Sequence, residues 1–283
     1  MASPSRTARI PIAPSANNVP PIVLAIGGSD SSAGAGIQAD LKAIAAHGGY
    51  ARTVVTAVTA QSSRGVQASE AVSAALVAQQ IAAAYEDAPP LAVKTGMLAT
   101  AAIVEVVADA MATRKPRWLV VDPVLRSSSG AALLDDAGAE ALRARLLPLA
   151  DLVTPNVAEA EALAGMTVRS ANDAEEAARR ILTLGPRAVL VKGGHLERNA
   201  ANDVLVTADG TSVFTGTWLP DRDVHGTGCA YASAIATWLA RGYALEAAIE
   251  DAKWYVEALI ATAVRVGDGA LMPQHFVDAE RLR

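Results

Sequence analysis

Short runs of aliphatic and β-branched residues alternate along this chain with longer segments in which apolar residues recur every three or four positions. Short apolar runs are typical of buried strands, and spacings of three and four are typical of helices that bury one face. Strands are predicted at residues 22–26, 53–58, 92–94, 118–121, 152–154, 187–192, 203–207 and 211–215. Helices are predicted around residues 37–44, 73–86, 136–146 and 228–242, after Thr100 and Asn156, and from Leu245 onward. This alternation favours an α/β fold with a mostly parallel sheet covered by helices.

The local spacings also make more specific predictions. In the first predicted helix, Ile37, Leu41 and Ile44 share one face, which we expect to be buried. The last two strands flank Asp209 and Gly210, a turn pair that predicts a hairpin.

The length of 283 residues allows one large α/β domain or two small ones. No internal repeat divides the chain, and we expect a single domain over residues 21–283. Residues 1–20 are rich in Ser, Pro, Ala and Asn, so we expect a flexible arm there.

Ligands of such sheets bind beyond the carboxyl ends of the strands. Several polar or glycine-rich segments follow predicted strands directly, and we expect them to converge on one edge of the sheet. They are residues 27–30, Gln61, residues 95–97, Asp122, Asn156 and residues 193–195.

Residues 223–229 carry the strongest local signal for chemistry. Gly226 and Gly228 open a predicted helix, and the only cysteine, Cys229, follows them. Unpaired amides at a helix start form a seat for an anion such as phosphate, and glycine lets the anion come close. The helix dipole should lower the pKa of a thiol in this first turn, which favours the thiolate. The alternative is a glycine-rich helix start with a small buried cysteine.

Two further groups are candidates for binding phosphate or a metal ion. Asn156 and Glu159 lie three residues apart at a helix start, where their oxygens suit hydrated Mg²⁺ near phosphates. Ordinary helix capping explains the same pair. Lys192 ends a strand before two glycines and suits a phosphate contact, although a lone lysine is more often a surface residue.

Residues 34–39 match the dinucleotide pattern Gly-x-Gly-x-x-Gly/Ala, but two features oppose that interpretation. The segment starts too far beyond the first strand for a tight turn, and the second strand ends at Gln61 rather than at an acid that would bind ribose. A substrate loop at a helix start fits better, with Asp40 one turn inside the helix. The alternative for Asp40 is a solvated acid on the helix surface.

Composition excludes several other classes. No Gly-x-x-x-x-Gly-Lys-Ser/Thr run exists, which excludes a P-loop nucleotide site. The four histidines lack metal-ligand spacing, which argues against a structural zinc site. The net charge of −5 argues against a nucleic-acid partner. No apolar run approaches membrane-spanning length, so we expect no membrane partner. A single cysteine gives no internal disulfide framework, and we expect a reducing cytoplasm.

Taken together, these motifs resemble bacterial hydroxymethylpyrimidine/phosphomethylpyrimidine kinases of thiamine biosynthesis, which belong to the ribokinase-like superfamily. The resemblance runs from Ile22 to about Phe276. The matching segments are residues 25–30, 34–42, 56–61, 94–98, 121–124, 154–156, 191–195 and 225–229. The resemblance implies a three-layer α/β/α sandwich and ATP- and Mg²⁺-dependent phosphorylation of 4-amino-5-hydroxymethyl-2-methylpyrimidine, of its monophosphate, or of both. It also implies a cytoplasmic homodimer.

Roles follow from the resemblance for each matching position. Asp40 and Gln61 would hydrogen-bond the aminopyrimidine edge, while Met97 and Gly28 would complete the pyrimidine site. The amides of Gly226 and Gly228 would form an anion hole, with Cys229 beside the hydroxymethyl oxygen as the base. The remaining residues would serve ATP and its metal ion, with Asn156, Thr227 and Lys192 on the phosphates and Glu159 and Asp122 on Mg²⁺.

The sequence also departs from the family pattern. Residues 62–64 read Ser-Ser-Arg where an Asn-Thr pair and a smaller residue are common, and residues 267–270 read Gly-Asp-Gly-Ala where Gly-His-Gly-Pro is usual. These departures leave open the relative activity on the alcohol and on the monophosphate. The alternatives are a pyridoxal or pyridoxine kinase of the same fold, a non-catalytic pyrimidine-binding relative and, more distantly, a dinucleotide-dependent oxidoreductase.

Overall fold

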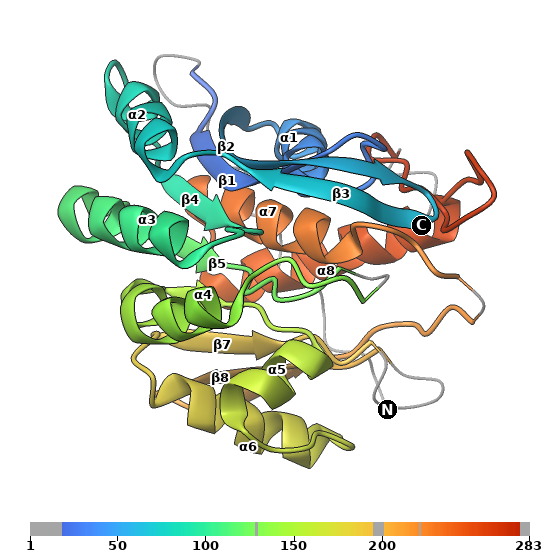
Figure 1. The fold of residues 1–283 in the computed structure, drawn as a ribbon. Helices are drawn as coiled ribbons and strands as arrows, with labels where there is room; N and C mark the ends of the chain where they lie inside the picture. The colour runs from blue at the N-terminus through green and yellow to red at the C-terminus, as the bar shows by residue number, and fades with distance from the viewer. Residues whose placement is uncertain (1–18, 128–129, 195–200, 221, 278–283) are drawn as a thin grey trace.

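The computed structural model describes residues 19–127, 130–194, 201–220 and 222–277. Within these residues a nine-stranded sheet has the order β3-β2-β1-β4-β5-β6-β7-β8-β9 (Figure 1). In this order, the neighbouring strands β2, β1, β4, β5, β6 and β7 run parallel. The pairs β2–β3, β7–β8 and β8–β9 are antiparallel. The strands are β1 (Ile22–Asp30), β2 (Tyr50–Ser62), β3 (Gly65–Ala71), β4 (Ala92–Thr95), β5 (Trp118–Val121), β6 (Leu152–Val153), β7 (Ala188–Val191), β8 (Asp203–Thr207) and β9 (Thr211–Phe214). The prediction of a mostly parallel sheet is confirmed.

Helices cover both faces of this sheet, which makes the three-layer sandwich. Helices α1, α7 and α8 pack on one face, and α2 to α6 pack on the other (Figure 1). Their bounds are α1 (Gly36–Ala46), α2 (Ala74–Tyr85), α3 (Ala101–Arg114), α4 (Asp136–Ala141), α5 (Val157–Ala164), α6 (Ala171–Leu182), α7 (Thr227–Ala240) and α8 (Leu245–Thr262). A π-helical turn (Leu142–Leu146) and a 3₁₀ turn (Leu147–Leu149) continue α4.

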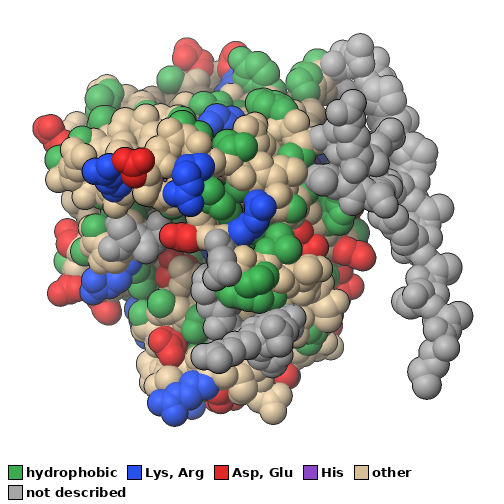
Figure 2. Space-filling model, turned by 90° about the vertical axis from the view of Figure 1, so that its right-hand side faces the viewer, with side chains coloured by type: hydrophobic (Ala, Val, Ile, Leu, Met, Phe, Trp, Pro, Cys, Tyr) green, Lys and Arg blue, Asp and Glu red, His purple; other side chains and the backbone are tan. Residues whose placement is uncertain are grey.

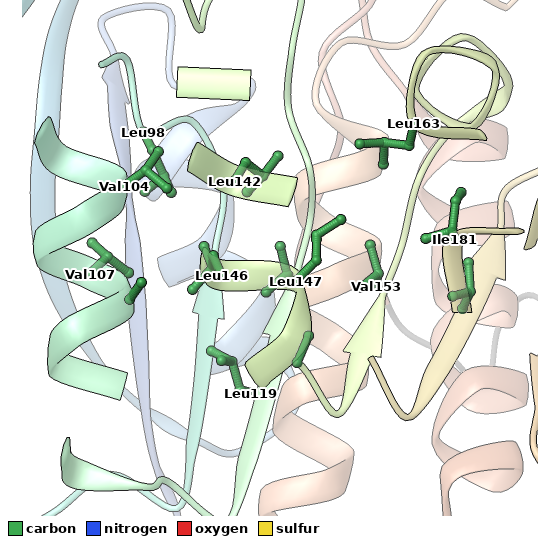
Figure 3. Packing of buried hydrophobic residues seen from close by; sticks show 14 of the residues in the cluster. Leu98, Val104, Val107, Leu119, Leu142, Leu146, Leu147, Val153, Leu163 and Ile181 are labelled. Carbon is green, nitrogen blue, oxygen red and sulfur yellow. The ribbon is translucent and has the colours of Figure 1, made fainter. Parts of the chain in front are cut away.

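The alternation of side chains along each strand builds two cores, one on each face. Along β1, Val23 and Ala25 join the core under α7 and α8, whereas Leu24 and Ile26 join the core under α2 to α6. All four are fully buried, because a central parallel strand is covered on both sides. Figure 3 shows the second core at close range, with side chains from several helices meeting residues of the strands.

The structure corrects three local predictions. Strand β3 was not predicted, because most of its residues are exposed and carry no apolar pattern. Strand β2 extends beyond its apolar centre at both ends, where it pairs with β1 and β3. Leu41 lies on the exposed side of α1 with 38% of its surface accessible, although Ile37 and Ile44 are buried as expected. The β8–β9 hairpin is confirmed, and the expected flexible arm at residues 1–20 falls almost wholly outside the described residues.

The surface carries charges of both signs. Figure 2 shows Lys and Arg interspersed with Asp and Glu on the face in view. No helix in the described part of the chain is long and apolar enough to span a membrane.

We expect Leu146→Ala to lower the free energy of unfolding by about 2–5 kcal/mol, because Leu146 is fully buried in the core of Figure 3 and its removal leaves a cavity. Leu149, three residues later, is 37% exposed and provides the matched control. Urea unfolding followed by circular dichroism measures both variants. Equal losses in the two variants would contradict this description of the core.

Candidate active site

Two loops at the carboxyl ends of the strands are in direct backbone contact. Gly226, which precedes α7, has a left-handed φ of 79°, and a Cβ atom there would overlap the carbonyl oxygen of Gly34 and lie 2.8 Å from Ala35 Cα. A Cβ atom at Gly34 would in turn lie 2.7 Å from a ring carbon of His225. The loop after β1 and the start of α7 therefore touch at glycines, with no room for a side chain between them.

The first turn of α7 has the features expected of an anion seat. Gly226 is its N-cap and supplies no capping side chain, so the first amides of the helix are not occupied by one. A Cβ atom at Gly228 would lie 3.3 Å from Lys192 Nζ and 4.0 Å from Asp122 Oδ2. The helix start thus faces an ammonium group and a carboxylate.

Lys192 and Asp122 form a largely buried ion pair at this position. Lys192 Nζ lies 2.8 Å from Asp122 Oδ1, and the Thr154 hydroxyl donates to the same oxygen at 3.2 Å. The three residues directly follow the parallel strands β7, β5 and β6. Burial opposes the charge on Lys192, but Asp122 and then Glu159 outweigh it and raise the pKa of the lysine.

Asn156 and Glu159 form a capping box at the start of α5, so the capping interpretation is correct for this pair. Asn156 Oδ1 accepts from the Glu159 amide at 2.9 Å, and Glu159 Oε2 accepts from the Asn156 amide at 2.8 Å. Glu159 is also buried beside the ion pair, and burial raises its pKa to about 7 despite the opposing effect of Lys192.

The charge balance here fits a divalent cation. Two carboxylates, Asp122 and Glu159, share one lysine, which leaves a net negative charge when both are ionised. Among the described residues, no three His, Cys, Asp or Glu side chains could hold a metal ion together. A Mg²⁺ ion would therefore need phosphate oxygens and water in addition to these two carboxylates, which is its usual coordination in such sites.

A second buried ion pair lies on the other side of the anion seat. Lys94 Nζ lies 2.8 Å from Asp40 Oδ1, both side chains are 1% exposed, and the Ser233 hydroxyl donates to the same oxygen at 2.8 Å. Asp40 Oδ2 is buried and accepts no hydrogen bond from the residues that the structure describes. The alternative of a solvated surface acid at Asp40 is therefore wrong.

Met97 and two glycines lie next to this second pair. A Cβ atom at Gly28 would lie 2.8 Å from Met97 Sδ, and one at Gly27 would lie 3.9 Å from both Asp40 Oδ2 and the Met97 amide. The structure thus brings together three of the four predicted pyrimidine-binding residues, Asp40, Met97 and Gly28.

Cys229 lies near both ion pairs. Its thiol interacts electrostatically with Lys94, Asp40 and Asp122, and it accepts a hydrogen bond from the backbone of Gly36. Burial raises the pKa of Cys229 to about 11, and the nearby lysine only partly opposes this effect. The prediction of a thiol pKa lowered by the helix start is therefore wrong, because burial, with Asp40 and Asp122, outweighs Lys94 and the hydrogen bond from Gly36.

Gln61, the fourth predicted pyrimidine-binding residue, lies beside His225. Its amide nitrogen is 2.5 Å from His225 Nε2, which lies 3.1 Å from Asp30 Oδ2. The two residues line a pocket of about 340 Å³, together with the turn between β2 and β3 and residues 269–270. Gln61 therefore lies on the side of the candidate pyrimidine site that faces His225 and this pocket.

A segment near the C-terminus connects that turn to the anion seat. The Ala270 amide donates to the Ser63 carbonyl at 2.8 Å, and Arg64 Nη2 lies 2.5 Å from Asp268 Oδ2. One residue later, the Leu271 carbonyl accepts from the His225 amide at 2.9 Å. Residues 268–271, which we call the strap, therefore touch both the β2–β3 turn and the segment that leads to Gly226.

Comparison with known proteins identifies the family. The phosphomethylpyrimidine kinase family matches residues 30–274. A hydroxymethylpyrimidine/phosphomethylpyrimidine kinase from Streptomyces coelicolor is 44% identical over 91% of this chain and 95% of the relative. This chain belongs to the phosphomethylpyrimidine kinase family.

Other members and neighbours of this family extend the comparison. A thiamine biosynthesis bifunctional protein from Geobacter sulfurreducens is 44% identical over 92% of this chain, and the chain spans about half of that longer relative, 53%. A phosphomethylpyrimidine kinase structure from Clostridium difficile is 41% identical, with a TM-score of 0.74 over 83% of this chain and 97% of the other. An ADP complex of Bacillus subtilis pyridoxal kinase is 33% identical, with a TM-score of 0.85 over 93% and 100%. The ribokinase-like fold is confirmed.

The family motifs converge at the expected edge of the sheet, but sequence reasoning missed part of the site. Lys94 and Ser233 were not singled out as site residues, although both bind Asp40. A lysine inside an apolar strand was the available signal for Lys94, because lysine is almost never fully buried without a partner. Nothing in the sequence marks Ser233 within its small-residue helix. His195 lies outside the described residues.

We expect Gly226→Ala to destabilise this kinase far more than Gly242→Ala. Both glycines have a left-handed φ, which costs an alanine about 1–2 kcal/mol. Only Gly226 contacts another backbone, since a Cβ atom at Gly242 meets nothing within 4 Å. Urea unfolding of both variants measures the difference, and equal losses would show that the contact with Gly34 is not constraining.

Proposed function

We propose that this protein transfers the γ-phosphoryl group of ATP to 4-amino-5-hydroxymethyl-2-methylpyrimidine and to its monophosphate, in thiamine biosynthesis. Relatives 36–44% identical to this chain are named for that kinase activity or for thiamine biosynthesis. The observation that carries the proposal is the position of Cys229 and the uncapped start of α7 near two buried Lys–Asp pairs. One pair belongs to the wall expected to bind the pyrimidine, and the other to the side expected to bind the phosphates.

The pyrimidine would bind where Asp40, Met97 and Gly28 meet. Within the described part of the chain, Asp40 Oδ2 is a buried acceptor without a donor, and leaving it unpaired costs free energy. An exocyclic amino group supplies the missing donor. Met97 offers an apolar surface for the ring, and Gln61 would complete the polar edge from the side of His225.

Phosphoryl transfer requires positioning and charge stabilisation more than covalent chemistry by the protein. The amides of Gly226 to Gly228 would bind the oxygens that gain negative charge, and Lys192 would add a positive charge beside them. Asn156 and Thr227 would contribute polar contacts to the phosphates. Bound Mg²⁺ would neutralise phosphate charge, and Asp122 and Glu159 are the residues that would hold it.

In the reaction, the hydroxymethyl oxygen bonds to the γ-phosphorus, the bond to the leaving ADP oxygen breaks, and the hydroxyl loses its proton. Cys229 would accept that proton in its thiolate form. Its raised pKa means that most of the protein holds it as a thiol, so only a small thiolate fraction can act as the base. We therefore assign the larger part of the rate enhancement to the anion seat. A general base such as Cys229 would contribute about 10²–10⁴-fold.

Three broader features belong to the same proposal. Residues 21–283 would form one domain, since a single sheet contains strands from Ile22 to Phe214. The protein would be cytoplasmic, as its single cysteine favours. It would act as a homodimer, and the exposed edge strand β3 offers a surface for a second copy.

A coupled assay of ADP release tests the function with the pyrimidine alcohol, its monophosphate and pyridoxal as separate acceptors. We expect turnover with the pyrimidines. Turnover with pyridoxal alone would instead support the vitamin B6 alternative, which the structural likeness to pyridoxal kinases keeps relevant. Pyrimidine binding without ADP release with either pyrimidine would support a non-catalytic relative.

We expect Cys229→Ala to lower kcat by about 10²-fold or more while the KM for the pyrimidine changes little, because a base acts in the transfer step. Cys229→Ser is the matched control, since it keeps a small polar group at the same position. Steady-state kinetics separates the two parameters. An unchanged kcat in Cys229→Ala would remove Cys229 from the mechanism.

A further inference from the structure

Lys94 is an unusual residue for the centre of a parallel sheet. It lies in β4, paired with Ala25 of β1 and Val120 of β5, and none of its surface is exposed. Lysine is almost never fully buried unless it is paired, and Asp40 is its partner at 2.8 Å. A Cβ atom at Gly96 would lie 2.9 Å from Lys94 Nζ, so this glycine leaves the space that the ammonium group fills.

The two oxygens of Asp40 have different surroundings. Oδ1 accepts from both Lys94 and Ser233, whereas Oδ2 is buried, finds no hydrogen-bond donor among the described residues and lies 3.9 Å from the position of a Cβ atom at Gly27. Two donors on one oxygen fix the carboxylate plane, so the other oxygen keeps one direction. That oxygen lies near Gly27, the residue directly before Gly28, and a Cβ atom at Gly28 would touch Met97 in the wall expected to bind the pyrimidine.

We propose that Lys94 is a positioning residue, which holds Asp40 ionised and oriented so that Oδ2 can accept a hydrogen bond from the amino group of the substrate. This inference rests on the proposed function, because it takes the aminopyrimidine as the ligand. Lys94 itself does not touch the substrate in this proposal. It acts through the carboxylate that does.

The charges around Asp40 explain why it depends on this lysine. Burial raises the pKa of Asp40, and Lys94 and Ser233 oppose that rise, while Asp122 at the end of β5 adds to it. Burial also opposes the charge on Lys94, but Asp40 outweighs it and raises the pKa of the lysine, with smaller effects of Cys229 from α7 and of Asp122. The ammonium therefore persists at working pH, and its removal leaves burial and Asp122 free to protonate Asp40.

A protonated Asp40 would be a weaker acceptor, because the hydrogen bond from the amino group would lose the negative charge that strengthens it. The pKa of Asp40 would be raised further in Lys94→Met, so the carboxylate that binds the amino group would be present only at higher pH. Pyrimidine binding by this variant should then improve as pH rises, with a midpoint shifted upward from that of the wild-type protein. The ligand is the same for both proteins, so its own titration cannot produce the shift.

A buried ion pair can also be purely structural, and the chain offers a matched control. Lys253 Nζ lies 2.7 Å from Asp203 Oδ2, with side chains 10% and 5% exposed. That pair connects α8 with the start of β8 and also binds the Tyr231 hydroxyl. Removing either lysine leaves an unpaired buried carboxylate and should lower thermal stability. Only removal of Lys94 should change pyrimidine binding.

Titration calorimetry with the pyrimidine alcohol tests the proposal on the full-length wild-type protein, Lys94→Met and Lys253→Met between about pH 5.5 and pH 9. We expect Lys94→Met to raise the Kd at least about tenfold at neutral pH, with a smaller loss at high pH. Lys253→Met should keep the wild-type Kd within about twofold. A wild-type Kd and pH profile in Lys94→Met, or an equal loss in both variants, would overturn the proposal.

Two further variants cover the case in which Lys94→Met does not fold. Lys94→Met/Asp40→Asn leaves no charge of the pair buried and should bind the pyrimidine without the upward-shifted pH dependence. Ser233→Ala keeps the lysine and should shift the midpoint upward by a smaller amount. If the double variant retained the shifted profile, or if Ser233→Ala left the midpoint unchanged, Asp40 would not be the titrating group and the role of Lys94 would fail. A wild-type protein that does not bind the pyrimidine would instead overturn the proposed function itself.

Discussion

The active site depends on one close contact, in which the backbone before α7 lies directly against the loop after β1. Gly226 touches Gly34 and Ala35 with no space for a side chain, and His225 packs against Gly34 from the same segment. This contact joins residues that are almost 200 positions apart in the sequence. It fixes the anion seat relative to α1, which carries Asp40, so the distance between the two halves of the site follows from backbone packing. Flexible side chains do not set that distance.

Around this contact the protein buries an unusual amount of charge. Each of the two lysines beside Cys229 is held by an aspartate at 2.8 Å, and hydroxyl groups of Ser233 and Thr154 complete the pairs. Such pairs are weak evidence for stability, because desolvation offsets much of their attraction. Their value here is geometric and electrostatic, since they keep fixed charges next to Cys229 and the start of α7. The same burial disfavours the thiolate of Cys229.

The fold was accessible from the sequence because its central strands are short apolar runs that are covered on both faces. β3 was not, because its exposed residues pair at the edge of the sheet and leave no hydrophobic pattern. The positions of the site motifs were also accessible, since each directly follows a strand. Their energetics were not: the helix-start argument gave the wrong direction for the pKa of Cys229, because that pKa depends on burial by segments distant in sequence. Asn156 and Glu159 show a similar limit, since the two residues cap a helix and Glu159 also lies beside the Lys192–Asp122 ion pair.

The strap gives two departures from the family pattern a common explanation. Arg64 and Asp268, 204 positions apart, both lie in segments that depart from the family pattern, and they form an ion pair in which Arg64 also lines the pocket. The β2–β3 turn and the strap are therefore joined by this ion pair and by the hydrogen bond from the Ala270 amide to the Ser63 carbonyl. A chimera that takes an Asn-Thr turn from a relative and keeps the strap of this protein would leave Asp268 without the guanidinium group of Arg64. An exchange of pocket rims between members of this family would keep the Arg64–Asp268 pair only if both segments were moved together.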